Sequence, residues 1–340
     1  MRITTRNSIF VAMKNTIETL SALGARLLGF GDDDATRAVM DAACRANGWF
    51  APADVRRAVR AVACDMLQRE KLEAWLANYP ALPVAAPRRV LVVMAGNIPL
   101  VGFFDLLCVL VSGHGCLVKP SAKDSVLMEH VVGLLREIDP SAPVRLYDGT
   151  SPVDAVIATG SDNANRYFRA HYAGIPSLLR GSRQSVAVLS GRETPEQLAG
   201  LADDIWAYSG LGCRSVSLIF APEGYEPALQ IPPVNDKYIN NYRQQRALLE
   251  MQGRPFVDLG CAVAVEQCAF PAALSRIAYA HYATLDEVVA WLAGHDGELQ
   301  CVVTGCLPHS RRAGFGCAQS PALTDYPDDR DVLAWLAALD

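Results

Sequence analysis

The stretch VLVVMAGNIPLVGFFD, residues 90–105, decides the fold class. Residues 90–96 are apolar, rich in β-branched side chains and end at a glycine, which is typical of a buried parallel strand. Pro99 then favours the start of a helix, which we expect to run to about residue 112. A strand that leads at once into a helix predicts the first half of a β-α-β unit.

The same alternation continues along the chain and predicts an α/β fold. A doubly wound, parallel-sheet cofactor domain is followed by a second α/β catalytic domain. In the first domain we expect strands at residues 116–120, 143–147, 154–158, 176–180 and 185–189, and helices at 124–137 and 161–171. In the second we expect a helix from a Thr194 cap, strands at 215–222, 261–265, 277–281 and 299–304, and helices at 234–252 and 285–294. A last helix, at 328–339, is expected after this domain.

Residues upstream of the first strand are predicted to be helical, because leucines fall at helical spacing and Pro52 favours the start of a long helix. Prolines between residues 80 and 87 end this part, since they cannot continue a helix. The predicted domains are a helical segment packing on the cofactor domain (1–85), a dinucleotide-binding domain (86–192), a catalytic cysteine domain (193–327) and a C-terminal helix (328–340).

The composition narrows the class of protein. With 51% apolar and 20% charged residues the chain is typical of a globular enzyme. A net charge of −5 without a basic stripe argues against a nucleic-acid partner, although Arg180 with Arg183 suits a phosphorylated small molecule. The apolar stretch 98–111 is too short to span a membrane and the N-terminus lacks the pattern of an export signal, so we expect a cytoplasmic protein.

The ten cysteines include no C-x-x-C pair and no Cys/His ligand spacing. In a chain expected to be cytoplasmic, this pattern predicts reduced and mostly buried thiols, with neither a disulfide framework nor a metal site. One of the ten can still be a nucleophile, and its sequence context has to identify it.

Asn97 follows the first buried strand. At the carboxyl end of a parallel sheet its side-chain amide is placed to face a bound ligand, where an N–H donor can stabilise an oxyanion. The alternative is that Asn97 only caps the helix that follows, and by themselves the residues favour the cap.

Two further motifs end predicted strands. VKPS, residues 118–121, places Lys119 where a lysine can bond ribose hydroxyls or phosphate, although a solvated lysine is the simpler interpretation. TGS, residues 159–161, starts a helix, whose N-terminal N–H groups attract a pyrophosphate. No G-x-G-x-x-G fingerprint is present, and TGS alone is a weak signal.

The loop YSGLGCRSVS, residues 208–217, holds the cysteine best suited to be a nucleophile. Gly210 and Gly212 allow a substrate to approach the backbone, and Arg214 is a cation that can lower the pKa of the Cys213 thiol. The other nine cysteines are predicted to be buried.

In order and spacing these motifs resemble the aldehyde dehydrogenase superfamily. LLRGSRQSVAVLSG (178–191), the Cys213 loop and FGCAQSPALTDYPDDRDVLAWL (315–336) resemble, more specifically, the fatty acyl-CoA reductases of bacterial bioluminescence operons and their relatives. The resemblance covers roughly residues 88–336. It implies Cys213 as nucleophile, Asn97 and the Cys213 backbone N–H as oxyanion donors, and a cofactor site made of Lys119, Ser121, Ala122, Lys123, Gly160 and Ser161.

Two departures from the superfamily carry chemical information. Aldehyde-oxidising members have a glutamate that activates water to hydrolyse the thioester, whereas this chain has Leu178-Leu179-Arg180-Gly181-Ser182 there. An acyl-enzyme without that base should survive to meet a hydride or a thiol.

NAD-preferring members place an acidic residue three positions after the strand-end lysine. Here Ala122 followed by Lys123 favours NADPH.

The sequence therefore predicts an NADPH-dependent reductase that converts an acyl-CoA to an aldehyde through an acyl-Cys213 thioester. No general acid or base can be assigned, and His171, His281 and His309 are candidates by residue type only. Three alternatives stay open: a reductase of acyl groups delivered by a carrier protein or a partner synthetase, a non-redox cysteine acyltransferase or thioesterase, and an inactive cofactor-binding subunit. A homo-oligomer is a further candidate assembly.

Overall fold

The computed structural model describes the backbone of residues 2–339 and the side chains of residues 13–339. The chain divides into two compact units. The first is made of residues 1–181 and 322–340, and the second of residues 182–321. The boundary lies upstream of the one suggested by the sequence, and the C-terminal part of the chain returns to the first unit. The functions assigned to the predicted domains stay predictions.

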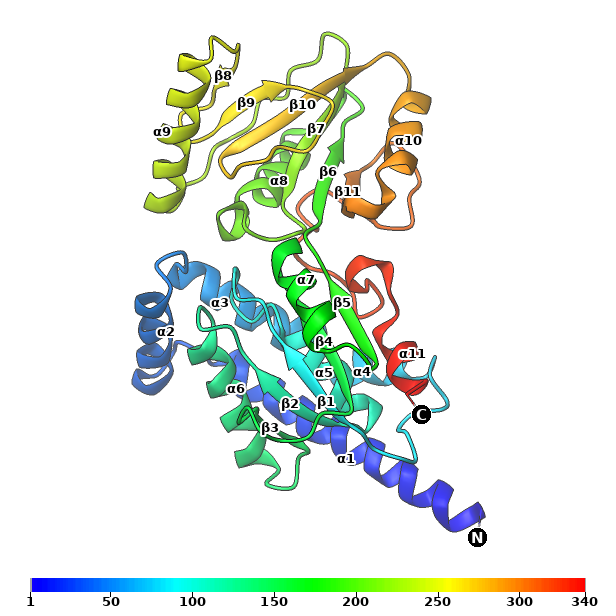
Figure 1. Cartoon of the computed structure of the whole chain (residues 1–340). Coiled ribbons are helices and arrows are strands. Elements are labelled where there is room, and N and C mark those ends of the chain that lie inside the picture. The colour runs from blue at the N-terminus through cyan, green and yellow to red at the C-terminus, as the bar shows by residue number, and fades with distance from the viewer. Residues whose placement is uncertain (1, 340) are drawn as a thin grey trace. The chain divides into compact units, whose positions relative to one another are not determined.

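A five-stranded parallel sheet organises the first unit (Figure 1). Its order is β3-β2-β1-β4-β5, and each neighbouring pair runs parallel. This arrangement confirms the predicted α/β class. The strands are β1 (Arg89–Val93), β2 (Gly115–Lys119), β3 (Val144–Leu146), β4 (Ala155–Thr159) and β5 (Ser177–Arg180).

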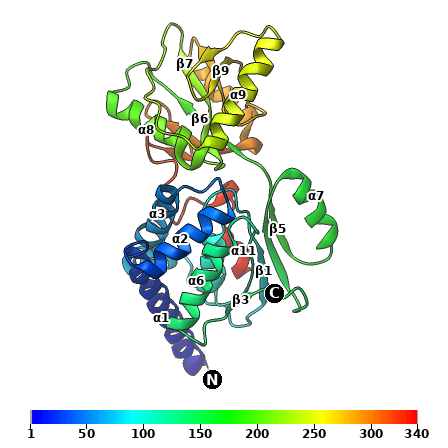
Figure 2. The same cartoon turned by 90° about the vertical axis from the view of Figure 1, so that its left-hand side faces the viewer.

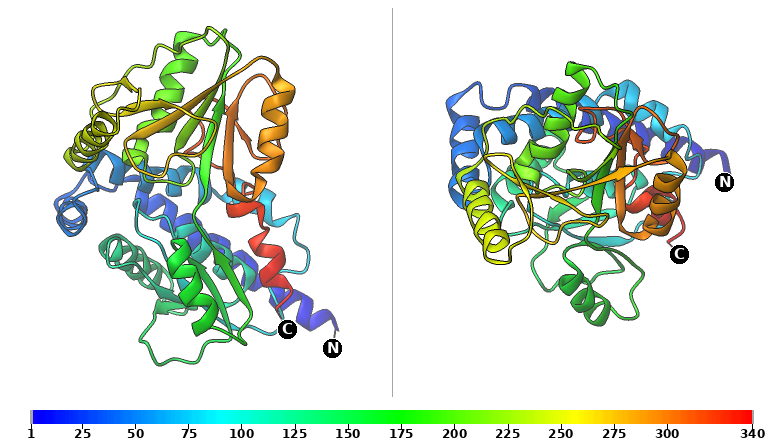
Figure 3. Two further views of the ribbon diagram at one scale, coloured as in Figure 1. Left: turned by 45° about the horizontal axis from the view of Figure 1, so that its top comes forward. Right: turned by 90° about the horizontal axis from the view of Figure 1, so that it is seen from above.

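Helices surround this sheet, as expected for the upstream segment and for the connections between strands. Helix α6 contacts both α1 and α2, and its place beside α2 can be followed in Figure 2. Helix α11 packs on α5 and is drawn in red in Figure 3. The helices are α1 (Arg2–Leu28), α2 (Asp34–Ala46), α3 (Pro52–Ala61), α4 (Arg69–Leu76), α5 (Phe103–Ser112), α6 (Ser125–Ile138), α7 (Asp162–His171) and α11 (Val332–Ala337).

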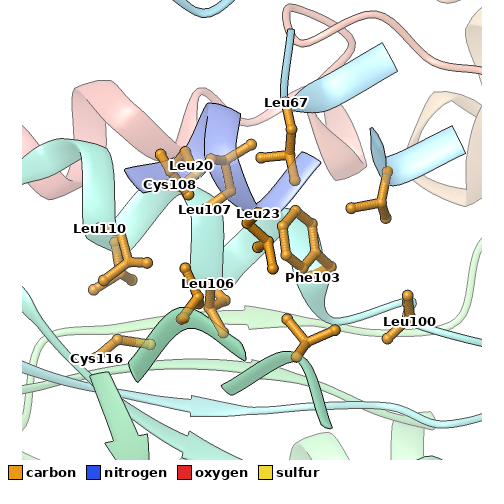
Figure 4. Packing of buried hydrophobic residues seen from close by; sticks show 14 of the residues in the cluster. Leu20, Leu23, Leu67, Leu100, Phe103, Leu106, Leu107, Cys108, Leu110 and Cys116 are labelled. Carbon is orange, nitrogen blue, oxygen red and sulfur yellow. The ribbon is translucent and has the colours of Figure 1, made fainter. Parts of the chain in front are cut away.

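Helix α5 forms the centre of the main core. Phe103, Leu106, Leu107 and Cys108 are fully buried, and the core reaches α1 through Leu23 and its neighbours (Figure 4). Burying a large apolar side chain contributes about 1.5–3 kcal/mol. The apolar run identified in the sequence therefore anchors the segment that leads from β1 into α5.

The second unit holds a seven-stranded sheet of order β12-β11-β6-β7-β10-β9-β8, parallel except for the edge pair β8 and β9. Its strands are β6 (Gln184–Val188), β7 (Val216–Pro222), β8 (Val257–Asp258), β9 (Val263–Glu266), β10 (Arg276–Tyr282), β11 (Leu299–Thr304) and β12 (Arg312–Ala313). Its helices are α8 (Pro195–Trp206), α9 (Asp236–Met251) and α10 (Leu285–Gly294), and Thr194 caps α8 as predicted.

Two helix predictions were wrong. The helix expected from Pro99 begins only at Phe103, because Leu100 has a left-handed backbone with φ of 54°. The long helix expected after Pro52 is interrupted by a π-helical turn, Val62–Met66, and by extended backbone at Gln68. Leu67, at this break, is buried against Gly24 of α1, so tertiary packing overrides the continuous helical pattern.

The C-terminal helix is also shorter than predicted. Helix α11 starts at Val332, where the Asp331 side chain accepts the Ala334 N–H, because Asp328 and Asp329 before it have left-handed backbones. Three hydrogen bonds among four side chains fasten this part of the first unit. The Trp75 indole donates to the Tyr326 hydroxyl at 2.8 Å, Tyr326 and Tyr79 share a hydrogen bond, and Tyr79 donates to Asp331 at 2.7 Å.

Within residues 2–339 we find no helix that is both long and apolar enough to cross a lipid bilayer.

Candidate functional site

The carboxyl ends of three strands, β1, β2 and β4, meet at one edge of the five-stranded sheet. Val93 of β1 pairs with Lys119 of β2 on one side and with Ala158 of β4 on the other. The chain leaves β1 toward β2 and returns on the opposite side at β4, so a topological switch point lies between β1 and β4. Ligands of open α/β sheets bind at such a point.

Two of the predicted motifs touch each other at this edge. A Cβ placed on Gly96 would lie 2.6 Å from Ser121 Cβ, 2.7 Å from Ser121 Oγ and 3.2 Å from Lys123 Cβ. Only a glycine therefore fits at residue 96. Asn47, which the sequence did not single out, donates its side-chain N–H to the Gly96 carbonyl at 3.4 Å. The structure thus brings the loop after β1 into direct contact with the loop after β2.

Asn97 lies in the bend that follows Gly96 and is half-buried. It does not cap α5, because that helix begins at Phe103 and Gly102 takes the N-cap position. The cap interpretation, which the residues alone favoured, is therefore wrong. The role of Asn97 toward an oxyanion stays a prediction.

The backbone after Asn97 is fixed from the loop after β2. Leu100 donates its N–H to Asp124 Oδ2 at 2.8 Å, and Asp124 is almost fully buried at the start of α6. Burial raises the pKa of the Asp124 carboxyl to about 8, against the opposing effect of the Leu100 hydrogen bond. Its second oxygen, Oδ1, has no hydrogen-bond partner. Sequence reasoning missed this contact, because no local pattern links residues 24 positions apart.

The loop after β2 presents its side chains to solvent. Lys119, Ala122 and Lys123 are exposed, and Ser121 is half-buried with its hydroxyl accepting the Lys123 N–H at 3.3 Å. The Lys119 carbonyl accepts the Met94 N–H at 3.0 Å, which ties this loop to the end of β1. Residues 119–123 contain two cations and no carboxylate.

The TGS motif starts α7. The Ser161 hydroxyl accepts the Ala164 N–H at 3.3 Å and caps the helix, while Gly160 lies against Ala164 and Phe168. The motif therefore has a structural role at the end of β4, next to the switch point. Its part in holding a pyrophosphate stays a prediction.

Arg180 and Arg183 do not form the basic cluster suggested by the sequence. Arg180 forms a buried ion pair with Asp105 of α5, and both side chains are at most 7% exposed. Arg183 belongs to the second unit and donates to the Asp296 and Gly297 carbonyls. A carboxylate therefore does lie at the end of β5, but Arg180 neutralises it.

The predicted nucleophile belongs to the second unit. Cys213 is exposed on a turn that leads into β7. Tyr208, Ser209 and Gly210 before it have consecutive left-handed backbones, with φ of 53°, 55° and 66°. Non-glycine residues adopt this conformation at a cost, and such strain is concentrated at functional sites. Ser185 of β6 donates its hydroxyl to the Cys213 carbonyl at 2.9 Å.

A second segment, residues 314–320, lies against the Cys213 turn. Arg214 Nη1 donates to the Ala318 carbonyl at 3.5 Å, and Gln319 Nε2 donates to Ser215 Oγ at 3.2 Å. Buried Asp204 of α8 accepts the N–H groups of Gly316 and Ala318 at 2.7 and 2.9 Å. Sequence reasoning missed Asp204 and Gln319, because a carboxylate that binds backbone more than 100 residues away leaves no local pattern.

All ten cysteines are free thiols, and fewer are buried than predicted. The exposed cysteines are Cys213, Cys268 and Cys317. The half-buried ones are Cys44, Cys64 and Cys306, and the buried ones are Cys108, Cys116, Cys261 and Cys301. The prediction was wrong for Cys317 because it lies in the irregular segment before the chain returns to the first unit, which no apolar periodicity describes. Exposure alone therefore does not select the nucleophile.

The second unit also has a cavity of about 220 Å³ beside the left-handed turn. It is lined by Gly210, by Ile205 and Tyr238, by the first residues of β6, β7 and β10, and by residues 271–275.

The three candidate histidines have local partners. His171 stacks on Tyr167 with ring centroids 5.2 Å apart, His281 Nδ1 bonds the Pro222 carbonyl at 3.2 Å, and His309 Nδ1 accepts the Arg311 N–H at 3.1 Å. Among the residues described, no group of three or more His, Cys, Asp or Glu side chains could hold a metal ion.

Comparison with known protein families shows which family the chain belongs to. Residues 46–230, more than half of the protein, match the family described as acyl-CoA reductase (LuxC). The chain belongs to the LuxC family. The matched residues include β1, the loops after β1, β2 and β4, and the Cys213 turn.

Two curated proteins are similar to this LuxC-family chain. One is the long-chain acyl-protein thioester reductase 2 of Photobacterium leiognathi, 24% identical over 46% of this chain and 37% of that protein. The other is the long-chain acyl-protein thioester reductase of Vibrio harveyi, 28% identical over 45% of this chain and 36% of that protein. The chain thus matches little more than a third of the length of these relatives.

Solved structures show the fold. A betaine aldehyde dehydrogenase variant from Staphylococcus aureus, in complex with NAD⁺, superposes with a TM-score of 0.60 over 86% of this chain and 72% of its own, at 12% identity. The LuxC-family chain therefore has an aldehyde-dehydrogenase-like fold, as the resemblance implied.

Proposed function

We propose that this protein reduces an acyl thioester to an aldehyde, with NADPH as the reductant and Cys213 as the nucleophile. The observation that carries the proposal is the exposed Cys213 thiol on a turn of left-handed backbone, within the part of the chain that matches the LuxC family. A strained and glycine-containing turn presents a side chain to a substrate without a large side chain beside it.

The Cys213 thiolate attacks the thioester carbonyl and forms a tetrahedral adduct, which expels the donor thiolate and leaves an acyl-Cys213 thioester. We assign the Asn97 amide and the Cys213 backbone N–H as donors to the oxyanion of that adduct. Ser185 supports this assignment, because its bond to the Cys213 carbonyl restrains the turn. Hydride addition to the thioester gives a thiohemiacetal on Cys213, which collapses to the aldehyde and regenerates the thiol.

The residues at the edge of the five-stranded sheet fit NADPH. Gly96 allows the loops after β1 and β2 to pack without a side chain between them, and the N-terminus of α7 lies beside the switch point. Exposed Lys119 and Lys123 would hold the ribose and its 2′-phosphate, and exposed Ala122 leaves no carboxylate to repel that phosphate. Bound NADPH supplies the hydride for reduction.

Arg180 supports reduction over hydrolysis. Asp105 is the carboxylate at the end of β5, where oxidising members of the superfamily are expected to have their base. Its buried pairing with Arg180 makes it unsuitable for activating water. The acyl-enzyme should then persist until hydride arrives.

Acyl-CoA is the donor that we propose, and the family description supports it. The names of the curated relatives favour a second candidate, an acyl group carried as a thioester on a protein. The test is to follow NADPH oxidation and aldehyde formation with acyl-CoAs of several chain lengths and with acyl-loaded carrier protein. Reduction of neither donor, despite acylation of Cys213, would replace the proposal by a cysteine acyltransferase.

A further inference from the structure

We propose that Gln319 is a positioning residue for the Cys213 thioester chemistry and that Asp204 holds it in place. This inference rests on the proposed role of Cys213 as nucleophile. It deepens that role by assigning a function to residues 314–320, which we call the wall. The wall orients the peptide group between Gly212 and Cys213, and the N–H of that group donates a hydrogen bond to the oxyanion.

The wall is anchored on α8 through its backbone. Both carboxylate oxygens of Asp204 accept N–H groups from it, and the Asp204 side chain is fully buried. Gly200, one turn earlier on the same helix, faces the same segment. A Cβ on Gly200 would lie 2.8 Å from Gly316 N and 2.8 Å from Phe315 C. Residues 314–320 therefore pack backbone to backbone on α8, and Asp204 fixes their register.

From this anchor the wall contacts residues on both sides of Cys213. Ala318 accepts the Arg214 guanidinium N–H, and the Gln319 side chain donates to the Ser215 hydroxyl. A Cβ placed on Gly212 would lie 3.5 Å from Gln319 Oε1 and 3.8 Å from Nε2. The Gln319 amide thus packs on the residue whose carbonyl forms the peptide bond to Cys213.

These contacts restrain the turn from one side while Ser185 restrains the Cys213 carbonyl from another. A preorganised N–H stabilises an oxyanion better than one that must reorient during the reaction, and the loss of one such donor costs about 10²–10³ in rate. Loosening the turn without removing the donor should have a smaller effect. Gln319 thus acts on the step that builds an oxyanion.

This role separates two reactions of the same thiol. Acylation of Cys213 passes through an oxyanion, whereas alkylation by iodoacetamide does not. We expect Gln319→Leu to slow acylation of Cys213 by p-nitrophenyl acetate or acyl-CoA about tenfold. Alkylation of Cys213 should change by less than about twofold, because the thiol stays exposed.

The experiment measures both rates at Cys213 by peptide mass spectrometry, so that Cys268 and Cys317 do not contribute. Gln267→Leu is the matched control, since Gln267 is a half-buried glutamine of the same unit whose side-chain amide donates to the nearby Ala269 carbonyl. Gln319→Glu should recover part of the rate, because its carboxylate can accept a hydrogen bond from the Ser215 hydroxyl. Asp204→Asn should show the same selective loss of acylation.

An unchanged acylation rate in Gln319→Leu, or an equal loss in acylation and alkylation, would overturn the inference, and so would an equal loss in Gln267→Leu. Failure of the proposed function looks different: the wild-type protein would not oxidise NADPH with any acyl thioester. The comparison with p-nitrophenyl acetate would still report on Gln319 in that case.

Discussion

The backbone N–H of Leu100 and the carboxyl group of Asp124 form a 2.8 Å hydrogen bond inside the first unit. It joins the loop that carries Asn97 to the first turn of α6. Leu100 has a left-handed backbone, so this bond holds a conformation that the chain would not adopt by itself. The geometry of the Asn97 loop therefore depends on a carboxyl group that lies outside that loop.

Asp124 should make stability depend on pH. Its pKa is raised to about 8 from an ordinary value of 3.8, mainly by burial, so the folded protein retains a proton that the unfolded chain releases above pH 4. The free energy of folding that this proton contributes is complete below about pH 4 and is lost as the pH rises through 8. Asp124→Asn keeps an acceptor for Leu100 and cannot ionise. We expect the Tm difference between pH 6 and pH 9 to shrink by a few degrees in the variant. Parallel Tm profiles for the two proteins would contradict this.

Cys213→Ala should abolish formation of the acyl-enzyme and consumption of NADPH, because no other side chain is assigned as nucleophile. Cys268→Ala, which removes an exposed thiol that lies outside residues 314–320, should leave both activities intact. Intact-protein mass spectrometry after incubation with acyl-CoA gives the measurement. An acyl adduct on Cys213→Ala would move the nucleophile to another residue.

Asn97→Ala should lower kcat by roughly 10²–10³, the usual loss for one oxyanion donor, with little change in NADPH affinity. The structure removes the competing explanation of a lost helix cap for α5, because Gly102 occupies that position. Steady-state kinetics together with the Kd for NADPH test the prediction. A kcat at the wild-type level would leave Asn97 without a catalytic role.

NADPH should be preferred over NADH. Lys123→Ala should cost about 1.5–3 kcal/mol in NADPH binding if its ammonium bonds the 2′-phosphate, and should leave NADH binding unchanged. Ala122→Glu should reverse or flatten the preference, since a carboxylate repels the phosphate and bonds a free ribose hydroxyl. The kcat/KM values for the two cofactors measure this. Equal values in the wild type that neither substitution alters would refute the assignment.

Arg180→Leu should destabilise the fold by about 3–5 kcal/mol, because it leaves the Asp105 carboxylate buried without its partner. Replacing both residues by leucine should recover much of this loss, since no uncompensated charge remains. Urea unfolding of the two variants and the wild type gives the free energies. A double variant no more stable than Arg180→Leu would show that the pair itself, and not the isolated charge, is what the fold requires.

Local sequence patterns predicted the sheets well because period and spacing are local properties. The apolar run from residue 90, the strand-end lysine and the TGS motif all lie where strand and helix periodicity placed them. Contacts that join distant residues were beyond such reasoning. The Arg180 pair with Asp105, the Leu100 bond to Asp124 and the Asp204 bonds to Gly316 and Ala318 each depend on the folded chain. These contacts hold the loops of the candidate site. Local patterns therefore identified the candidate site residues, but not the distant residues that hold them in place.

The hydrogen-bonded set of Trp75, Tyr79, Tyr326 and Asp331 has a consequence for the order in which the protein is made. The whole second unit is inserted between β5 and the segment that carries Tyr326 and α11. During synthesis the ribosome must therefore translate all of residues 182–321 before it translates α11, which belongs to the first unit. Until then α5 lacks the surface supplied by α11, with which it packs in the finished fold. Of the two units, the first is thus begun before the second and completed after it.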